Sequence, residues 1–224
     1  MSGQMTLKDS LVKQLTADIV SGKYKVGDSL PSERELSAMF GVSRTVVRVG
    51  LAELAASGLV ETKDRSGSVV LDFQNNASMS VLNAILSSGG NLSAELMQGF
   101  LEARMLLEVE TARLAARRRS DEDLFQLYGI LRRELTFGPY SAQEMTETSF
   151  LFHRQIAVAG GNPIYPIFIC SMESTYKILL RKYYDGGVTA GEVVPMHRRL
   201  YEAIFDMDEN AAAAGMKEIL EYRV

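Results

Sequence analysis

Two stretches decide the architecture of the first part of the chain: Leu30-Pro31-Ser32-Glu33-Arg34-Glu35-Leu36 and, after residues 37–40, Gly41-Val42-Ser43-Arg44-Thr45-Val46-Val47-Arg48. Ser32 and Glu35 have the spacing of a capping box, which predicts a helix from about residue 33 to 40. Gly41 suits the positive φ of a tight turn, and Ser43 is a good N-cap for a second helix over residues 44–57. Two helices joined by so short a turn predict a helix-turn-helix.

The segments on either side complete this unit. Upstream, Leu11, Leu15 and Ile19 recur every four residues and predict one apolar helical face. Downstream, residues 59–62 and 68–71 have strand character and flank a polar, basic tip. A helix, a helix-turn-helix and a hairpin in this order predict a winged helix-turn-helix over residues 1–72.

The outer face of the second helix carries the residues expected to bind DNA. Arg44 and Thr45 stand in its first turn, the part that usually enters the major groove, with Arg48 one turn later. An arginine there can bind a guanine edge with two hydrogen bonds. Arg34 and Ser43 suit phosphate contacts. Lys63 and Arg65 at the hairpin tip are placed to reach phosphates or the minor groove. The alternative is a charged helix face that is merely solvated.

Composition and charge agree with a globular intracellular protein. Apolar residues make up 46% of 224, and no run of about 18 of them predicts a membrane span. The first residues lack the apolar stretch of a secretion signal, and a single cysteine, Cys170, allows no internal disulfide, so we expect the cytoplasm. The net charge of −4 resides in residues 73–224, with fifteen basic and nineteen acidic residues, because residues 1–72 hold nine of each.

The second part of the chain shows helical periodicity throughout. After a linker and short helix over residues 73–92, the pattern predicts an antiparallel helical bundle over residues 93–224. The expected helices are 93–118, 121–136, 141–159, 163–184, 191–206 and 209–222.

Residues 8–71 closely resemble the GntR family of bacterial regulators, through the two quoted stretches, Gly58-Leu59-Val60-Glu61, and a wing that ends Gly67-Ser68-Val69-Val70. The resemblance implies DNA contacts at five positions, Arg34, Ser43, Arg44, Thr45 and Arg48, and in the wing, including Gly67. The chain departs from the family pattern at Gly50, which costs up to about 1 kcal/mol relative to Ala inside a helix. It departs again at Arg65, where a glycine is common.

Residues 78–222 resemble the effector-binding FCD domain of the FadR subfamily, through residues 102–108, 112–116, 152–153, 161–163 and 197–204. The resemblance implies a divalent-metal site made by one Asp and three His. Only His153 and His197 are present; Ser149 and Ile219 stand at the other two positions. A hydroxyl is a poor ligand for Zn or Ni and an isoleucine is none, so we expect no metal cofactor.

An effector pocket between the helices is therefore expected to use Arg104, His153 and His197, with Ser149 as a weaker candidate. The resemblance implies that Arg104 faces the cavity and can bind a carboxylate with two hydrogen bonds. The alternatives are two buried histidines with satisfied hydrogen bonds and an arginine paired structurally, for example with Glu108.

These features predict a non-enzymatic transcription repressor that binds operator DNA as a homodimer and responds to a small organic acid. One alternative is a regulator whose helical domain serves only for dimerisation. Another, from a different class, is a metal-dependent enzyme, but the sequence has neither a His-Glu-x-x-His motif nor a serine-nucleophile motif.

Overall fold

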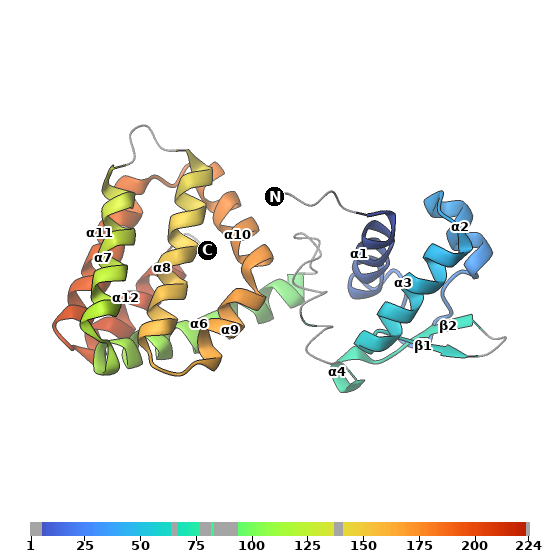
Figure 1. Cartoon of the computed structure of the whole chain (residues 1–224), viewed down its shortest axis with the longest axis horizontal. Coiled ribbons are helices and arrows are strands. Elements are labelled where there is room, and N and C mark those ends of the chain that lie inside the picture. The colour runs from blue at the N-terminus through green and yellow to red at the C-terminus, as the bar shows by residue number, and fades with distance from the viewer. Residues whose placement is uncertain (1–5, 64–66, 77–81, 83–93, 137–140, 223–224) are drawn as a thin grey trace. The chain divides into compact units, whose positions relative to one another are not determined.

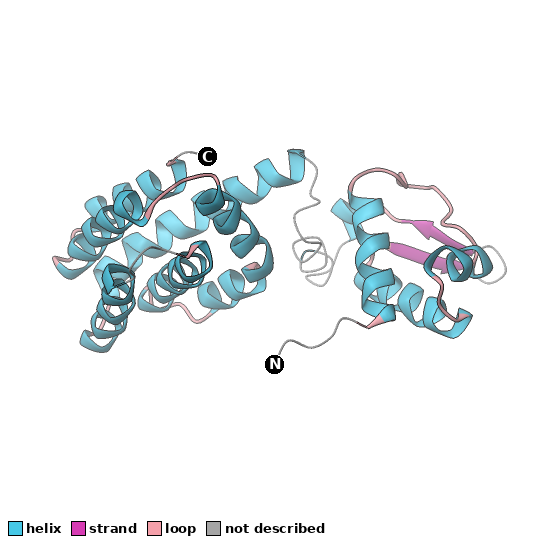
Figure 2. Cartoon of the chain, turned by 90° about the horizontal axis from the view of Figure 1, so that it is seen from above, coloured by secondary structure: helices cyan, strands magenta, loops and turns pink. Residues whose placement is uncertain are grey.

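A computed structural model describes residues 6–63, 67–76, 82, 94–136 and 141–222. The chain divides into two compact units, residues 1–95 and 96–224, and each is described by itself. Strands occur only in the first unit among the described residues, and the second is drawn as helices and their connections (Figures 1 and 2). No helix in the described ranges is both long enough and apolar enough to cross a membrane.

The first unit has the predicted winged helix-turn-helix. Its helices are α1 (Leu7–Val20), α2 (Glu33–Phe40) and α3 (Arg44–Ser57), followed by strands β1 (Val60–Lys63) and β2 (Gly67–Val70) and the short helix α4 (Phe73–Asn76). The strands pair in antiparallel register, from Val60 opposite Val70 to Lys63 opposite Gly67. Each strand differs from its predicted range by one residue. The rest of the expected linker, apart from residue 82, lies outside the described residues.

The core of the first unit lies where α1 packs on α3 and α3 packs on α2 and β1. All three residues of the predicted apolar face of α1, Leu11, Leu15 and Ile19, are buried. Thr6 and Asp9 form a further capping box at the start of α1, which the sequence analysis did not single out.

The second unit is an all-helical bundle. Its helices are α6 (Ala94–Arg118), α7 (Asp121–Thr136), α8 (Ala142–Ala159), α9 (Ile164–Ser171), α10 (Glu173–Asp185), α11 (Ala190–Phe205) and α12 (Glu209–Glu221). Helix α8 packs against α7, α9 and α10, whereas α11 packs against α7 and α12. Figure 1 shows α8 running alongside α7 and α10.

One helix prediction in this unit is wrong. The range 163–184 was expected to be a single helix, but the chain turns at Met172 between α9 and α10. A methionine gives no local break signal, because it neither fixes φ nor lacks an N–H. Met172 is buried beside the core, so packing of the two helices determines the turn.

The main core of the bundle contains small residues of α6 facing larger side chains. Ala112, Ala115 and Ala116 belong to the same buried cluster as Phe152 and Leu200. Short alanine side chains of α6 therefore contribute to the core beside larger residues of α8 and α11.

Candidate nucleic-acid interface and effector pocket

The turn between α2 and α3 has the geometry that a helix-turn-helix needs. Gly41 ends α2 with φ of 62°, a left-handed conformation that favours glycine. The Ser37 hydroxyl donates a hydrogen bond to the Val42 carbonyl at 2.5 Å and so ties α2 to the turn. The Ser43 hydroxyl accepts a bond from the Val46 N–H and caps α3. These contacts set the angle at which α3 leaves the turn.

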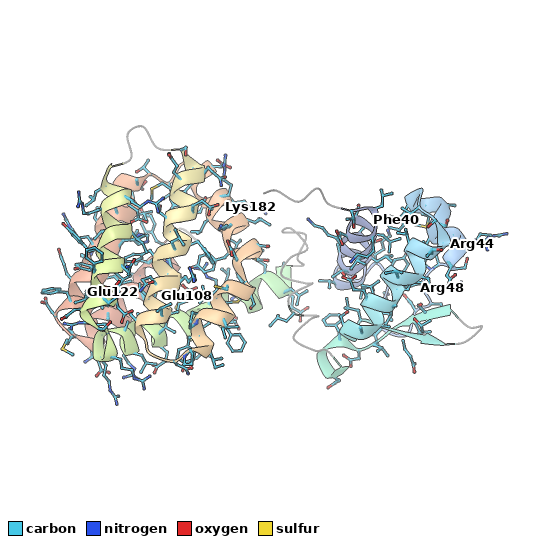
Figure 3. The ribbon with its side chains drawn as sticks, in the orientation of Figure 1. Phe40, Arg44, Arg48, Glu108, Glu122 and Lys182 are labelled. Atoms are coloured by element: carbon cyan, nitrogen blue, oxygen red, sulfur yellow. The ribbon has the colours of Figure 1, made fainter. Side chains whose placement is uncertain are left out.

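Helix α3 separates a buried face from a charged one. Val47 and Leu51 are buried against the rest of the unit, whereas Arg44, Thr45 and Arg48 are exposed. Arg44 and Arg48 lie on the side of α3 away from α1 (Figure 3). The structure thus brings three of the predicted DNA-binding side chains onto one solvent-facing surface of one helix.

Arg48 of α3 pairs with a carboxylate at the start of α2. Its Nε and Nη2 donate to the two carboxylate oxygens of Glu33 at 3.1 and 2.9 Å. The hydrogen bond from Arg48 lowers the pKa of Glu33. Since the arginine side chain is 74% exposed, a phosphate could replace this carboxylate without burying either charge.

The remaining predicted DNA-binding residues are only partly visible. Arg34 and Ser43 are exposed, and Gly67 begins β2 with φ of 83°. Arg65 and the side chain of Lys63 lie outside the described residues.

Gly50, the departure from the family pattern, faces α1. A Cβ built on it would lie 2.6 Å from Cδ2 of Leu11, which is fully buried. A side chain there would force Leu11 to move. The absence of a side chain therefore permits the close approach of α1 and α3.

The second unit contains a pocket of about 330 Å³, a volume within the range of small-molecule sites. It brings together all four predicted effector-binding residues, Arg104, Ser149, His153 and His197, and also Ile219. The rest of its lining is mainly apolar or aromatic, with one further lysine: Leu101, Leu179, Leu180, Lys182, Tyr183, Tyr184, Val193, Leu220 and Tyr222.

Glu108, a buried carboxylate on α6 (Figure 3), contacts two of the residues that line this pocket. Its Oε1 accepts a bond from Nε of Arg104 at 2.7 Å. Its Oε2 lies 2.5 Å from Nδ1 of His153 and accepts the Tyr176 hydroxyl at 2.8 Å. The Arg104 guanidinium also lies over the Tyr176 ring, 3.8 Å from its centre. Arg104 thus fulfils both of the roles that the sequence left open: it lines the pocket, and it forms an ion pair with Glu108.

These contacts determine the charges of the groups. Burial alone would raise the pKa of Glu108, but the charge of Arg104 and the bond with His153 outweigh it and lower that pKa to about 2. Burial lowers the pKa of His153, although Glu108 acts in the opposite direction. Glu108 is therefore ionised and His153 is neutral at pH 7.

The second histidine has a carboxylate of its own. Nδ1 of His197 lies 2.8 Å from Oε2 of Glu134, a residue with no exposed surface. The His197 ring stacks on Phe152, with centres 4.4 Å apart. Ser149, in contrast, is engaged with Tyr184, their hydroxyl oxygens 2.6 Å apart.

The residues present do not form the four-ligand metal site that the FCD resemblance implies. Ser149 shares a hydrogen bond with a tyrosine, and Ile219 presents only carbon to the pocket. In the described part of the chain, no group of three or more His, Cys, Asp or Glu side chains is placed to hold a metal ion.

Sequence reasoning missed several residues of this site, namely Glu134, Tyr176, Tyr184 and Lys182. Glu134 had a usable signal, because it continues the buried spacing of Leu124, Leu127 and Leu131 on α7. A carboxylate on an apolar helical stripe indicates a buried partner. Tyr176 and Tyr184 had no comparable signal, since aromatic residues fill cores without any polar role.

Two family models match the chain. The model described as bacterial regulatory proteins, gntR family, matches residues 7–70, and the FCD domain model matches residues 100–222. The chain belongs to the GntR family and carries an FCD domain. It is accordingly a DNA-binding transcription regulator with an effector-binding domain.

Transcription regulators of other bacteria align over most of its length. The HTH-type transcriptional regulator LutR of Bacillus subtilis is 31% identical over 208 residues, 88% of this chain and 90% of LutR. The galactonate operon transcriptional repressor of Escherichia coli is 28% identical over 213 residues, 93% of this chain and 92% of the repressor. The solved structure of Lar from Listeria monocytogenes shares the fold, with a TM-score of 0.60, 17% identity and coverage of 98% and 95% of the two chains.

Proposed function

We propose that this GntR regulator is a repressor that a small organic acid releases from its operator, and that the acid binds in the Arg104 pocket without a resident metal. The observation that carries the proposal is a buried arginine in the wall of a largely apolar pocket. Buried cationic side chains in such pockets fix the orientation of an anionic ligand.

Arg104 retains the means to bind a carboxylate although Glu108 is its partner. The bond to Glu108 uses Nε alone, and a guanidinium has five N–H donors. A ligand carboxylate can accept two bonds from its remaining edge, a geometry that arginine favours. Lys182, exposed on α10 and part of the lining, adds a second positive charge.

The two imidazoles support a site for an organic ligand. With their Nδ1 atoms on Glu108 and Glu134, both rings are held in fixed orientations in the pocket wall. In metal sites such carboxylates orient histidine ligands; with two of four ligand positions taken by Ser149 and Ile219, the same arrangement can orient hydrogen bonds to an effector.

Control of DNA binding requires that the pocket affect two recognition helices. We infer a homodimer, in which two copies of α3 meet successive major grooves of a palindromic operator. Apolar side chains stand exposed on the bundle, including Leu106 (80% exposed) on α6 and Ile167 (62%) on α9, and suit a contact between copies. The effector would then shift the population between DNA-binding and released forms of the dimer.

The name of one relative supports both halves of this proposal. The Escherichia coli homologue is described as a repressor, and its operon as that of galactonate, which is a hydroxylated carboxylic acid.

The test measures the melting temperature, Tm, against a panel of organic acids, with and without Zn²⁺ or Ni²⁺. We expect an acid at about 100 times its Kd to raise Tm by several degrees. Arg104→Lys should abolish that shift, because lysine keeps the charge beside Glu108 but lacks the planar fork. Arg113→Lys is the matched control, since Arg113 lies on the same helix and pairs with Glu110 outside the pocket.

Four results would contradict parts of the proposal. A shift that persists in Arg104→Lys removes Arg104 from the site. A shift with metal alone contradicts the metal-free pocket. No shift with any acid contradicts the carboxylate class and favours a bundle that serves for dimerisation only. An acid that binds but strengthens binding to operator DNA contradicts release by the ligand. The acid would then be a co-repressor, or the protein an activator.

A further inference from the structure

Arg104 and His153 are held side by side by a single carboxylate. One oxygen of Glu108 contacts Nε of Arg104, and the other contacts Nδ1 of His153. Both side chains also line the pocket. A ligand group bound to Arg104 therefore has His153 as its neighbour.

The direction of the bonds around Glu108 fixes which nitrogen of His153 carries hydrogen. An ionised carboxylate can only accept, so Nδ1 must be the donor. The positive charge of Arg104 already balances Glu108, and the imidazole has no second role as a counter-ion. A neutral imidazole with hydrogen on Nδ1 has none on Nε2. Within the described residues, no hydrogen bond to Nε2 is present.

We propose that Glu108 determines the specificity of the pocket by holding Nε2 of His153 as a hydrogen-bond acceptor, so that the effector is a carboxylate with a hydroxyl group on a carbon near its carboxyl end. This inference rests on the carboxylate effector proposed above. The carboxylate binds Arg104, and the adjacent hydroxyl donates to Nε2. Glu108 is a positioning residue, since it acts through Arg104 and His153 and does not itself contact the ligand.

The same geometry disfavours two related kinds of acid. An acid without the hydroxyl covers the Nε2 lone pair without giving it a donor, which is costly. A 2-oxo acid places a carbonyl oxygen, itself an acceptor, against that lone pair. We confine the assignment to His153, because Glu134 has no arginine beside it in the described structure: its Oε2 meets His197 and its Oε1 has no hydrogen-bond partner.

The first test reads the hydrogen position directly, without any effector. The chain has only two histidines, so long-range ¹H–¹⁵N spectra of the full-length protein contain two imidazoles, which His197→Gln assigns. We expect the nitrogen shifts of His153 to show a protonated Nδ1 and an unprotonated Nε2. A protonated Nε2 would overturn the proposal. Glu134→Gln is the control, expected to change the His197 signals and leave those of His153 in place.

The second test compares affinities within matched series of acids of three to six carbons: the 2-hydroxy acid, the unsubstituted acid and the 2-oxo acid. We expect the hydroxy acid to bind about tenfold more tightly than either analogue, because only it satisfies Nε2. Equal binding of all three would overturn this inference and leave the carboxylate proposal standing. If no acid binds, the carboxylate proposal and the ligand class both fail, while the nitrogen shifts still decide the role of Glu108.

A variant of Glu108 tests whether this carboxylate causes the preference for hydroxy acids. In Glu108→Gln, the amide oxygen can remain on Arg104 while the amide NH₂ turns to His153, which moves the imidazole hydrogen to Nε2. We expect the preference for the hydroxy acid over the 2-oxo acid to disappear or reverse. An unchanged preference in a folded variant would overturn the proposal. Should the variant not fold, the wild-type spectra and affinities remain decisive.

Discussion

The two units each contain an arginine paired with a glutamate, in opposite surroundings. Between α3 and α2, the side chains of Arg48 and Glu33 are 74% and 36% exposed; in the bundle, those of Arg104 and Glu108 are 10% and 1% exposed. The exposed arginine can exchange its carboxylate for a DNA phosphate because water solvates both throughout. The buried arginine cannot leave Glu108, so it must bind a ligand with the N–H groups that do not donate to Glu108. The first pair suits a surface that forms and breaks contacts, and the second suits a fixed receptor.

The largest effect should follow from breaking the buried pair. Glu108→Ala leaves Arg104 charged and without its carboxylate, which we expect to destabilise the helical unit by about 3–5 kcal/mol. Thermal unfolding should show a loss of about 10 °C in Tm. Glu102→Ala, an exposed carboxylate on the same helix, is the control and should change Tm little. A loss below about 1 kcal/mol would show that Glu108 is not needed to balance Arg104.

The exposed face of α3 should respond in DNA binding and not in stability. Arg44→Ala should weaken operator binding about 10- to 100-fold, the usual value of an arginine that binds a guanine edge. Its Tm should equal that of the wild type, because the side chain is exposed. Binding is measured by fluorescence anisotropy at fixed salt, with Arg132→Ala on the bundle as control. An equal loss for operator and unrelated DNA would instead assign Arg44 to a phosphate.

The next largest effect should be a difference between the two units in how their stability depends on acid pH. The pKa of Glu108 is lowered from 4.5 to about 2, so between these values the unfolded chain binds more protons and stability is lost as the pH falls. The pKa of His153 is lowered from 6.5, so stability is lost in the same direction from about pH 6.5 downward. Unfolding followed by urea at pH 7, 5.5 and 4 should show the helical unit weakening first. His153→Gln should reduce the dependence of the free energy of unfolding on pH between pH 6.5 and 5. An unchanged dependence would contradict a neutral buried imidazole.

The smallest effect should come from the surface pair itself. Arg48→Ala and Glu33→Ala should each change Tm by less than about 2 °C, because exposed ion pairs contribute little and salt screens them. A double-mutant cycle measures their coupling. Strong coupling that persists at high salt would show that this pair holds α2 against α3 and is not free to exchange with phosphate.

The sequence predicted the first unit almost to the residue, because its signals are local. The Ser32 capping box, Gly41 and the Ser43 cap act within four residues, and α2 and α3 begin and end where these signals place them. The tip of the wing was expected to bind DNA on the same grounds, and that expectation remains a prediction.

The bundle was predictable in outline and less so in its chemistry. Helical periodicity located most helices, but packing determines the turn at Met172. The four predicted pocket residues line one cavity. They could be predicted because the family resemblance indicated them. Their organisation by Glu108 and Glu134 depends on contacts across 45 and 63 residues of chain, which no local pattern encodes.

Glu134 has a consequence for how this protein can evolve or be engineered. Its Oε1 is fully enclosed and has no hydrogen-bond partner in the described structure, a condition that costs about 1–3 kcal/mol relative to water. An apolar side chain of similar size at this position alone would remove that cost but leave the buried Nδ1 of His197 without its partner, so stabilisation requires that both residues change together. Variants chosen for heat resistance should therefore accumulate paired changes at Glu134 and His197, and gain thermal stability at the expense of ligand response.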